Sequence, residues 1–281
     1  MTRIAVVQFD PELGAPARNL DQIEAHAARA AEGGAELAVF PECAVTGYVY
    51  RSLDEALEQS QEIPGAISDR LAGIAAQNNL YMVVGLLERA GGRCFNAAIL
   101  CGPGGLLAVY RKTHTLCLGV DRFTTPGDIP YQVHDLPFGR LGILICYDLR
   151  FPEAARSLAL RGAQLLVLPT NWPVSSTIQP DVFVRARAGE NRVYIAAANR
   201  VGAERGTRFL GRSQIVAPDG MVVAEGSRDA SEMLLQDVDL SAADQKHVVL
   251  TPGEHEMNCF QDRRPEMYRD LVAEPLAAEV R

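Results

Sequence analysis

The sequence lacks the long apolar run of a membrane protein and the basic surplus of a nucleic-acid-binding protein. None of its 281 residues lie in a run approaching the roughly 18 apolar residues that a spanning helix needs. The N-terminus also becomes polar too soon for a secretory signal peptide. Acidic residues outnumber basic ones by 35 to 27, giving a formal net charge of −8. We therefore expect neither a membrane nor a nucleic acid as partner, and a small-molecule substrate instead.

Cysteine is scarce and scattered, which argues against a disulfide framework. There are six cysteines in the chain and no Cys-x-x-Cys pair, so a zinc ribbon is not indicated either. We expect free thiols in a cytoplasmic protein, most of them small core residues. The six are Cys43, Cys94, Cys101, Cys117, Cys146 and Cys259.

Motifs of several other enzyme classes are missing as well. No Gly-x-x-x-x-Gly-Lys or Gly-x-Gly-x-x-Gly occurs, so the glycines at 91–92 and 103–105 indicate turns rather than a phosphate cradle. No Gly-x-Ser-x-Gly elbow of a serine hydrolase is present, and nothing indicates a partner imidazole for a cysteine protease. His114 and Cys117 have a spacing that could ligate a metal, but no second pair accompanies them, so no metal is expected.

What the chain does contain is a regular alternation of short apolar strands and amphipathic helices. With no linker, repeat or low-complexity segment, this alternation predicts one layered α/β domain. Strands are expected at 3–8, 37–40, 80–88, 94–101, 106–110, 131–135, 140–146, 164–168, 193–198, 213–217, 221–225 and 233–238. Helices are expected at 19–31, 67–78, 152–161 and 181–192, with a short one at 264–273 in a polar tail.

Three reactive side chains follow directly on predicted strands. Glu42, Lys112 and Cys146 each lie just past a strand end, where open α/β sheets carry their chemistry. If these strands lie side by side, the three groups meet at one rim. A thiolate could then attack a carbonyl or nitrile carbon, a carboxylate could move protons, and an ammonium could hold the oxyanion. A helix N-terminus close to Cys146, together with Lys112, is expected to favour its thiolate.

Three ordered segments resemble the signatures of the nitrilase, or carbon–nitrogen hydrolase, superfamily. They are Phe40-Pro-Glu-Cys-Ala-Val-Thr-Gly-Tyr48, Tyr110-Arg-Lys-Thr-His114 and Cys146-Tyr-Asp-Leu-Arg-Phe-Pro-Glu153. The likeness covers roughly residues 3–270. It implies a four-layer α-β-β-α sandwich in a single domain over 1–270, a C-terminal tail over 271–281, and pairing with a second copy as a homodimer or larger homo-oligomer.

The resemblance also implies roles for the three strand-end residues. It makes Glu42 the general base, Lys112 the oxyanion-stabilising cation and Cys146 the nucleophile, with the Tyr147 backbone N–H beside Lys112. The implied reaction passes through a thioester and needs no metal or organic cofactor. Asn171, Trp172 and Tyr48 are candidate substrate contacts, although Trp172 could equally only pack.

The chain departs from the family pattern at several positions. Many members carry a second active-site glutamate after the lysine, where this chain offers Val120 or Asp121, so Asp121 is a tentative substitute. Gly189 stands inside a predicted helix where the family usually has a larger apolar residue. Cys43 lies beside the proposed base, but its place in the motif indicates a packed residue rather than the nucleophile. Polar residues of the helix 181–192 are expected to form ion pairs or a subunit contact.

The segment after the cysteine separates the branches of the superfamily. Cys-Tyr-Asp-x-Arg-Phe-Pro-Glu looks like the amidase and Nit-type ω-amidase branches, so hydrolysis of a small carboxamide is the expected activity. An N-carbamoyl amide hydrolase and a nitrilase with the same triad are the alternatives within the class. A catalytically silent binding or scaffold member is the alternative from another class, and the intact triad argues against it.

Overall fold

The computed structural model describes residues 1–273 and contains two compact units, Met1–Asp244 and a C-terminal unit that begins at Gln245. The larger unit contains two six-stranded sheets. No helix in the described part of the chain is long and apolar enough to cross a membrane. The predicted tail, 271–281, lies largely outside the described residues, and the predicted domain end at 270 remains a prediction.

The first sheet has three parallel central strands with antiparallel neighbours on both sides. Its order is β14-β1-β2-β3-β4-β5, and β3, β4 and β5 form the predicted antiparallel meander. β1, β2 and β3 are parallel, and β14 pairs antiparallel with β1. The strands are β1 (Thr2–Gln8), β2 (Leu37–Val39), β3 (Tyr81–Ala90), β4 (Arg93–Gly102), β5 (Gly105–Arg111) and β14 (Glu232–Val238).

The second sheet repeats this arrangement. Its order is β13-β12-β9-β8-β7-β6, with β7, β8 and β9 parallel and the outer strands antiparallel. The strands are β6 (Val133–Leu136), β7 (Gly139–Ile143), β8 (Leu165–Thr170), β9 (Tyr194–Asn199), β12 (Gln214–Val216) and β13 (Val222–Glu225). A small β10–β11 hairpin (Ala203–Glu204, Thr207–Arg208) lies outside both sheets.

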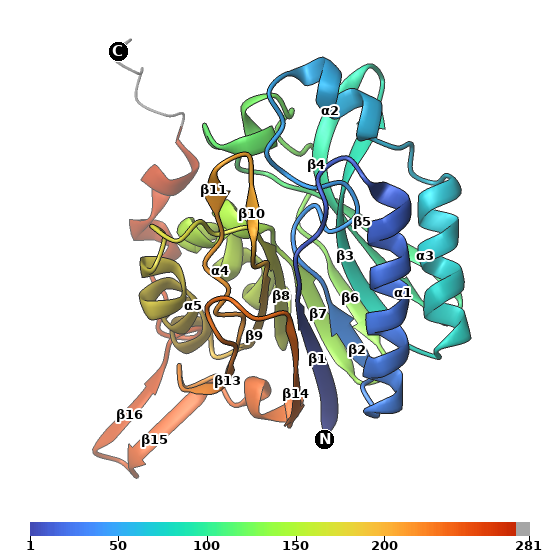
Figure 1. The fold of residues 1–281 in the computed structure, drawn as a ribbon. Helices are drawn as coiled ribbons and strands as arrows, with labels where there is room; N and C mark the ends of the chain where they lie inside the picture. The colour runs from blue at the N-terminus through green and yellow to red at the C-terminus, as the bar shows by residue number, and fades with distance from the viewer. Residues whose placement is uncertain (274–281) are drawn as a thin grey trace. The chain divides into compact units, whose positions relative to one another are not determined.

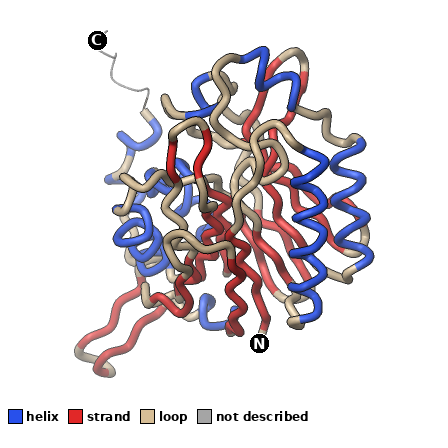
Figure 2. Tube along the Cα trace, viewed as in Figure 1, coloured by secondary structure: helices blue, strands red, loops and turns tan. Residues whose placement is uncertain are grey.

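Helices cover the outer faces of both sheets, so the larger unit has four layers (Figures 1 and 2). α1 (Pro16–Glu32) and α3 (Ala66–Gln77) cover the first sheet, and α4 (Pro152–Leu160) and α5 (Val184–Asn191) cover the second. β1 shows why the sheets stack, because its alternate residues are buried on both faces. Ala5 and Val7 belong to the core cluster under the helices, whereas Ile4 and Val6 are equally buried on the opposite face. The predicted α-β-β-α sandwich is confirmed.

The structure differs from the sequence prediction mainly where short elements follow one another. β7 ends at Ile143, so Cys146 lies in the 3₁₀ turn Cys146–Arg150 rather than on a strand. The predicted helix 181–192 is a π-turn, Gln179–Phe183, followed by α5. The predicted helix 264–273 is two 3₁₀ turns, Pro265–Met267 and Arg269–Val272. The periodicity of the sequence cannot separate such short 3₁₀ and π segments from an α-helix, because each covers barely one turn.

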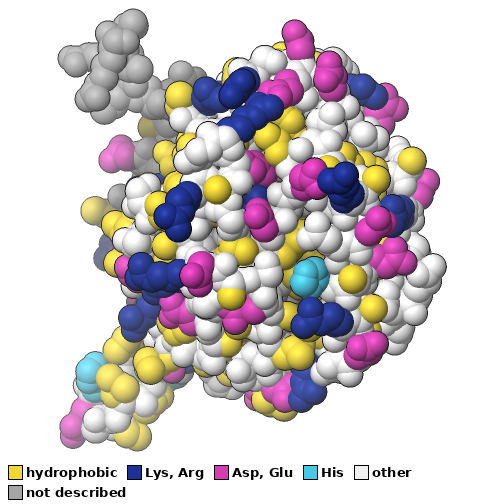
Figure 3. Space-filling model, in the orientation of Figure 1, with side chains coloured by type: hydrophobic (Ala, Val, Ile, Leu, Met, Phe, Trp, Pro, Cys, Tyr) yellow, Lys and Arg dark blue, Asp and Glu magenta, His cyan; other side chains and the backbone are white. Residues whose placement is uncertain are grey.

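Other elements of residues 1–273 were not predicted at all. They are the helix α2 (Leu53–Gln59), the 3₁₀ turns Gly119–Arg122 and Leu240–Asp244, the β10–β11 hairpin, and a β15–β16 hairpin (His247–Thr251, His255–Asn258) in the C-terminal unit. At Gly189, where the family usually has a larger apolar residue, a Cβ would lie in ordinary van der Waals contact with the Asp219–Gly220 turn, 3.8 Å from the Gly220 nitrogen. On the face shown in Figure 3, acidic and basic side chains are interspersed.

Candidate active site

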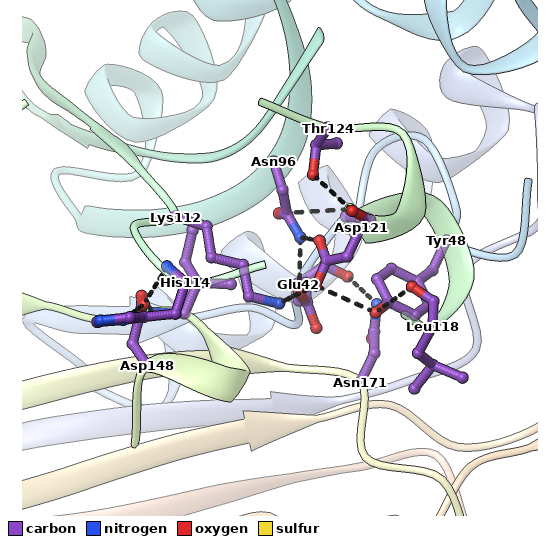
Figure 4. Close-up of polar contacts among 12 residues, drawn as sticks. Glu42, Tyr48, Asn96, Lys112, His114, Leu118, Asp121, Thr124, Asp148 and Asn171 are labelled. Atoms are coloured by element: carbon purple, nitrogen blue, oxygen red, sulfur yellow. Dashed lines mark hydrogen bonds and ion pairs between the residues drawn. The ribbon is translucent and has the colours of Figure 1, made fainter. Parts of the chain in front are cut away.

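Glu42, Lys112 and Asp121 meet in a buried cluster at the strand ends, although they come from separate segments of the chain (Figure 4). Glu42 follows β2, Lys112 follows β5, and Asp121 lies in the 3₁₀ turn Gly119–Arg122. All three side chains are inaccessible to solvent. The expected meeting of Glu42 and Lys112 is therefore observed, and Asp121 joins them from a turn rather than from a strand end.

A glycine on the neighbouring strand allows the Glu42 segment to lie where it does. A Cβ at Gly85 of β3 would stand 2.5 Å from the Cys43 nitrogen and 2.5 Å from the Pro41 carbonyl oxygen. Real Cβ atoms do not approach that closely, so only glycine permits the segment to cross the strand here. The Val45 N–H also donates to the Gly85 carbonyl at 3.1 Å. Gly85 therefore allows the position of Glu42.

Lys112 is held between two carboxylates. Its Nζ donates to Glu42 Oε1 at 2.7 Å and to Asp121 Oδ2. Asn96 Nδ2, from β4, donates to the same Glu42 oxygen at 2.7 Å and to Asp121 Oδ1 at 2.8 Å. Of the two tentative positions for a second acid, Asp121 is the one beside the lysine, and Val120 packs in an apolar cluster.

Burial and neighbouring charges shift the pKa values of this cluster. Burial raises the pKa of Glu42 above its ordinary value; the charge of Lys112 opposes the shift, and that of Asp121 adds to it. Burial alone would lower the pKa of Lys112, but the charges of Asp121 and Glu42 outweigh it and hold the pKa well above the usual range. These shifts favour the charged form of Lys112, and they make the protonated form of Glu42 more accessible than that of an exposed glutamate.

Cys146 begins the 3₁₀ turn Cys146–Arg150 with a left-handed backbone, φ +44°, and is only 8% exposed. The expectation that its surroundings favour the thiolate is wrong in net effect. Burial, followed by the charge of Glu42, raises the pKa of the thiol, and this outweighs the opposing influence of Lys112, the Asn171 backbone N–H and the Thr170 hydroxyl. The thiol therefore keeps its proton until a base removes it.

The end of β8 brings further polar groups to the site. Asn171 Nδ2 donates to the backbone carbonyl of Glu42 at 2.8 Å. Glu42 Oε2, Asn171 Oδ1 and Trp172 Nε1 are all buried without a hydrogen-bond partner. Buried polar atoms are normally paired, so unpaired ones at a reactive centre are suited to a bound molecule. Trp172 is 1% exposed, which shows that it packs tightly whatever else it contacts.

Tyr48 contacts the cluster directly, whereas Tyr147 lies in the turn that begins at Cys146. The Tyr48 hydroxyl donates to the Leu118 carbonyl at 3.1 Å and lies 3.4 Å from Asp121 Oδ2, so it supports the second acid. Tyr147 follows Cys146 in the 3₁₀ turn, and its ring packs edge-on against Phe151. The placement of the Tyr147 backbone N–H beside Lys112, which the resemblance implied, stays a prediction.

Two groups near the site were missed by sequence reasoning. Asn96 joins both acids, and its only signal is a lone polar residue inside the apolar strand β4. Asp148, two residues after the cysteine, is fully buried and carries four hydrogen bonds, whereas it was read only as part of a motif. A polar residue within an apolar run was thus the one usable signal for Asn96.

Several residues that sequence reasoning set aside have structural contacts. Cys43 is fully buried beside Asn96, and burial raises its thiol pKa well above the usual value. In α5, Arg187 forms the expected ion pair with Glu190 and also donates to the Leu149 carbonyl at 3.0 Å, behind the turn that carries the cysteine. His114 contacts Asp148. Within residues 1–273 no group of three or more potential ligands is arranged to hold a metal ion.

Fold and site together define a hydrolase of the cysteine-nucleophile class, and comparison with known proteins identifies its family. Residues 3–247 match the carbon-nitrogen hydrolase family model. The chain is 36% identical over 272 residues to a protein named nitrilase from Pyrococcus abyssi, covering 95% of this chain and 99% of that protein. It is 32% identical over 252 residues to omega-amidase NIT2 of Xenopus tropicalis, covering 85% and 88%.

Solved structures agree with the sequence relatives. A mutant amidase from Nesterenkonia sp. AN1, showing Michael addition of acrylamide at its active-site cysteine, superposes with a TM-score of 0.81. The two chains are 31% identical, and the match covers 97% of this chain and 100% of that one. The chain belongs to the carbon–nitrogen hydrolase family, as the resemblance implied.

Proposed function

We propose that the protein hydrolyses the C–N bond of a small carboxamide through a thioester on Cys146. The observation that carries the proposal is the buried Lys112 ammonium, held between Glu42 and Asp121 beside a thiol that keeps its proton. A carboxylate with a raised pKa is suited to accept that proton, and a fixed cation is suited to an oxyanion. The amidase and omega-amidase names of the relatives support the same substrate class.

The first half of the reaction follows from the charges of the cluster. Glu42 takes the Cys146 proton as Sγ bonds to the amide carbon and the carbonyl π bond opens. The negative charge thus moves from the Glu42 carboxylate to the oxyanion, and the net charge of the buried site does not change. Lys112 and the Tyr147 backbone N–H stabilise the oxyanion. The C–N bond then breaks, and Glu42 returns the proton to the departing nitrogen, which leaves as ammonia or an amine.

The second half removes the acyl group. Glu42 takes a proton from water, the resulting hydroxide attacks the thioester carbon, and the C–S bond breaks to release the acid. Cys146 recovers its proton from Glu42. The residues of this chain therefore supply every proton transfer, and the sequence-based expectation of no metal or cofactor is retained in the proposal.

The unpaired acceptors favour an amide over a nitrile. An amide NH₂ carries two N–H donors, which Glu42 Oε2 and Asn171 Oδ1 can accept, whereas a nitrile nitrogen has none. Leaving a buried acceptor unpaired costs roughly 1–3 kcal/mol, so a nitrile would be bound less well. Purified protein tested for ammonia release on carboxamides, nitriles and ureido acids decides between the substrates. Preferential turnover of ureido acids would replace the amidase by an N-carbamoyl amide hydrolase, and turnover of nitriles alone would refute the amide assignment.

We also propose that the protein works as a homodimer in the cytoplasm. Apolar side chains around the start of α5 are exposed, among them Val174, Ile178 and Val182, and burial against a second copy would remove them from water. All six cysteines are free thiols, which fits a reducing compartment. Light scattering at several protein concentrations tests the dimer, and a purely monomeric mass would contradict it.

A further inference from the structure

The Asp148 carboxylate is the most heavily bonded acid of the described chain outside the Lys112 cluster. Its Oδ1 accepts the His114 backbone N–H at 3.0 Å and lies 2.7 Å from His114 Nδ1. Its Oδ2 accepts the Ile145 backbone N–H at 3.0 Å and the Tyr110 hydroxyl at 2.7 Å. Because a carboxylate only accepts, the His114 Nδ1 must carry the proton in this contact.

One pair of these bonds closes the turn that carries the nucleophile. The Asp148 backbone N–H donates to the Ile145 carbonyl at 2.9 Å, while the Ile145 N–H donates to the Asp148 side chain. Cys146 lies between these two residues with its left-handed φ of +44°, a conformation that a non-glycine residue adopts only when its surroundings enforce it. Asp148 supplies that enforcement from both its backbone and its side chain.

The other bonds reach the segment that carries the cation. Tyr110 stands two residues before Lys112 and His114 two residues after it, so Asp148 contacts this segment on both sides of the lysine. The same carboxylate thus holds Ile145 and the residues around Lys112. No direct bond between Cys146 and Lys112 is needed for their relative placement to be fixed.

We propose that Asp148 is a positioning residue that sets Cys146 against Lys112, acting through the Nδ1–H of His114. The carboxylate touches neither of the reacting groups in this role; it fixes the two backbone segments from which they extend. The expected effect on turnover rests on the proposed function. The placement of the thiol does not, because it can be measured without any substrate.

The His114 ring offers a way to separate hydrogen bonding from packing. Besides its bond to Asp148, the ring stacks on Phe151 with centroids 3.7 Å apart and planes 8° apart. His114→Asn keeps a donor near the position of Nδ1 and loses the stacking. His114→Phe keeps an aromatic ring and loses the donor. If the hydrogen bond matters, His114→Asn should have the higher kcat and Cys146 alkylation rate; if packing matters, His114→Phe should have them.

The experiment measures kcat and KM for a carboxamide, and separately the rate of Cys146 alkylation by iodoacetamide, located by peptide mass spectrometry. Asp148→Asn is expected to lower kcat about 100-fold, the usual effect of a displacement near 1 Å, with KM changed less than about threefold. Alkylation of Cys146 slows as well. His114→Phe is expected to resemble Asp148→Asn, and His114→Asn to recover most of the wild-type kcat and alkylation rate.

The opposite order, with His114→Phe active and His114→Asn impaired, would overturn the proposal in favour of packing. Asp148→Asn with kcat and alkylation within twofold of wild type would overturn it as well. If Asp148→Asn does not fold, as judged by its thermal transition, the two His114 variants decide. If the wild type turns over no carboxamide, the proposed function fails, while the order of the alkylation rates still tests the positioning role.

Discussion

Replacing Lys112 by methionine removes the single cation that separates two buried carboxylates. At an effective dielectric constant of about 20, its attraction to Glu42 across 2.7 Å amounts to about 6 kcal/mol. Desolvation offsets part of this attraction, and removing one partner of a buried ion pair costs roughly 3–5 kcal/mol. We therefore expect Lys112→Met to lower the free energy of unfolding by an amount in that range near neutral pH.

The loss is expected to depend on pH in a definite direction. The folded-state pKa of Glu42 is raised mainly by burial, so the folded protein loses stability as pH rises through that pKa. Without Lys112 the pKa rises further, because the lysine charge is what holds it down. The deficit of Lys112→Met is thus largest near pH 8 and smaller near pH 5, where one carboxyl accepts a proton.

Denaturation in urea at both pH values, followed by circular dichroism, measures this difference. The matched control is Lys112→Met combined with Asp121→Asn, which removes one of the two charges and should recover part of the lost stability. A deficit equal at the two pH values, or a double variant no more stable than Lys112→Met, would refute the charge argument. Either result would mean that the lysine stabilises the site through packing alone.

Four further predictions concern the proposed base, the second acid, the nucleophile and the backbone beside the base. Glu42→Gln should reduce kcat about 10²- to 10⁴-fold as expected for loss of a general base, and a smaller effect would assign the proton transfer elsewhere. Asp121→Asn should move the acid limb of kcat/KM to lower pH, because the Asp121 charge helps to raise the pKa of Glu42; an unmoved limb would contradict this. Cys146→Ala should abolish turnover while leaving the thermal transition intact, and residual activity would place the catalyst elsewhere. Gly85→Ala should impair turnover because its Cβ collides with backbone, whereas Gly73→Ala in α3, with open space around it, should not; equal activities would contradict the packing argument.

The strand-end argument predicted much of the site because it depends only on local patterns. Apolar runs ending at a polar residue identified Glu42 and Lys112. Glu42 follows the central parallel strand β2, and Lys112 follows the edge strand β5, which runs in the same direction as β2 and β3 although it pairs antiparallel with β4. The four-layer architecture came from the ordered motifs and is confirmed. Cys146 was correctly placed near a strand end, although two residues, Leu144 and Ile145, separate it from β7.

The rest depended on properties that a pattern does not contain. Burial raises the pKa of the Cys146 thiol by more than the charge of Lys112 lowers it. The extent of burial is known only once the layers are assembled. The sequence could not decide whether Val120 or Asp121 takes the place of the second acid, because the loop lacks periodicity. In the structure a 3₁₀ turn directs Asp121 to Lys112 and Val120 into an apolar cluster. Asn96 was hidden in an apolar strand, and Asp148 within a motif.

The central claim, a thioester on Cys146, is tested most directly by mass spectrometry of the enzyme quenched during turnover of a slow carboxamide. We predict a mass increase equal to the acyl group, located on the peptide that contains Cys146. Cys43, which is buried beside the base, should remain unmodified. Turnover with the acyl group on Cys43, or with no covalent adduct under conditions where acylation is faster than hydrolysis, would contradict the account.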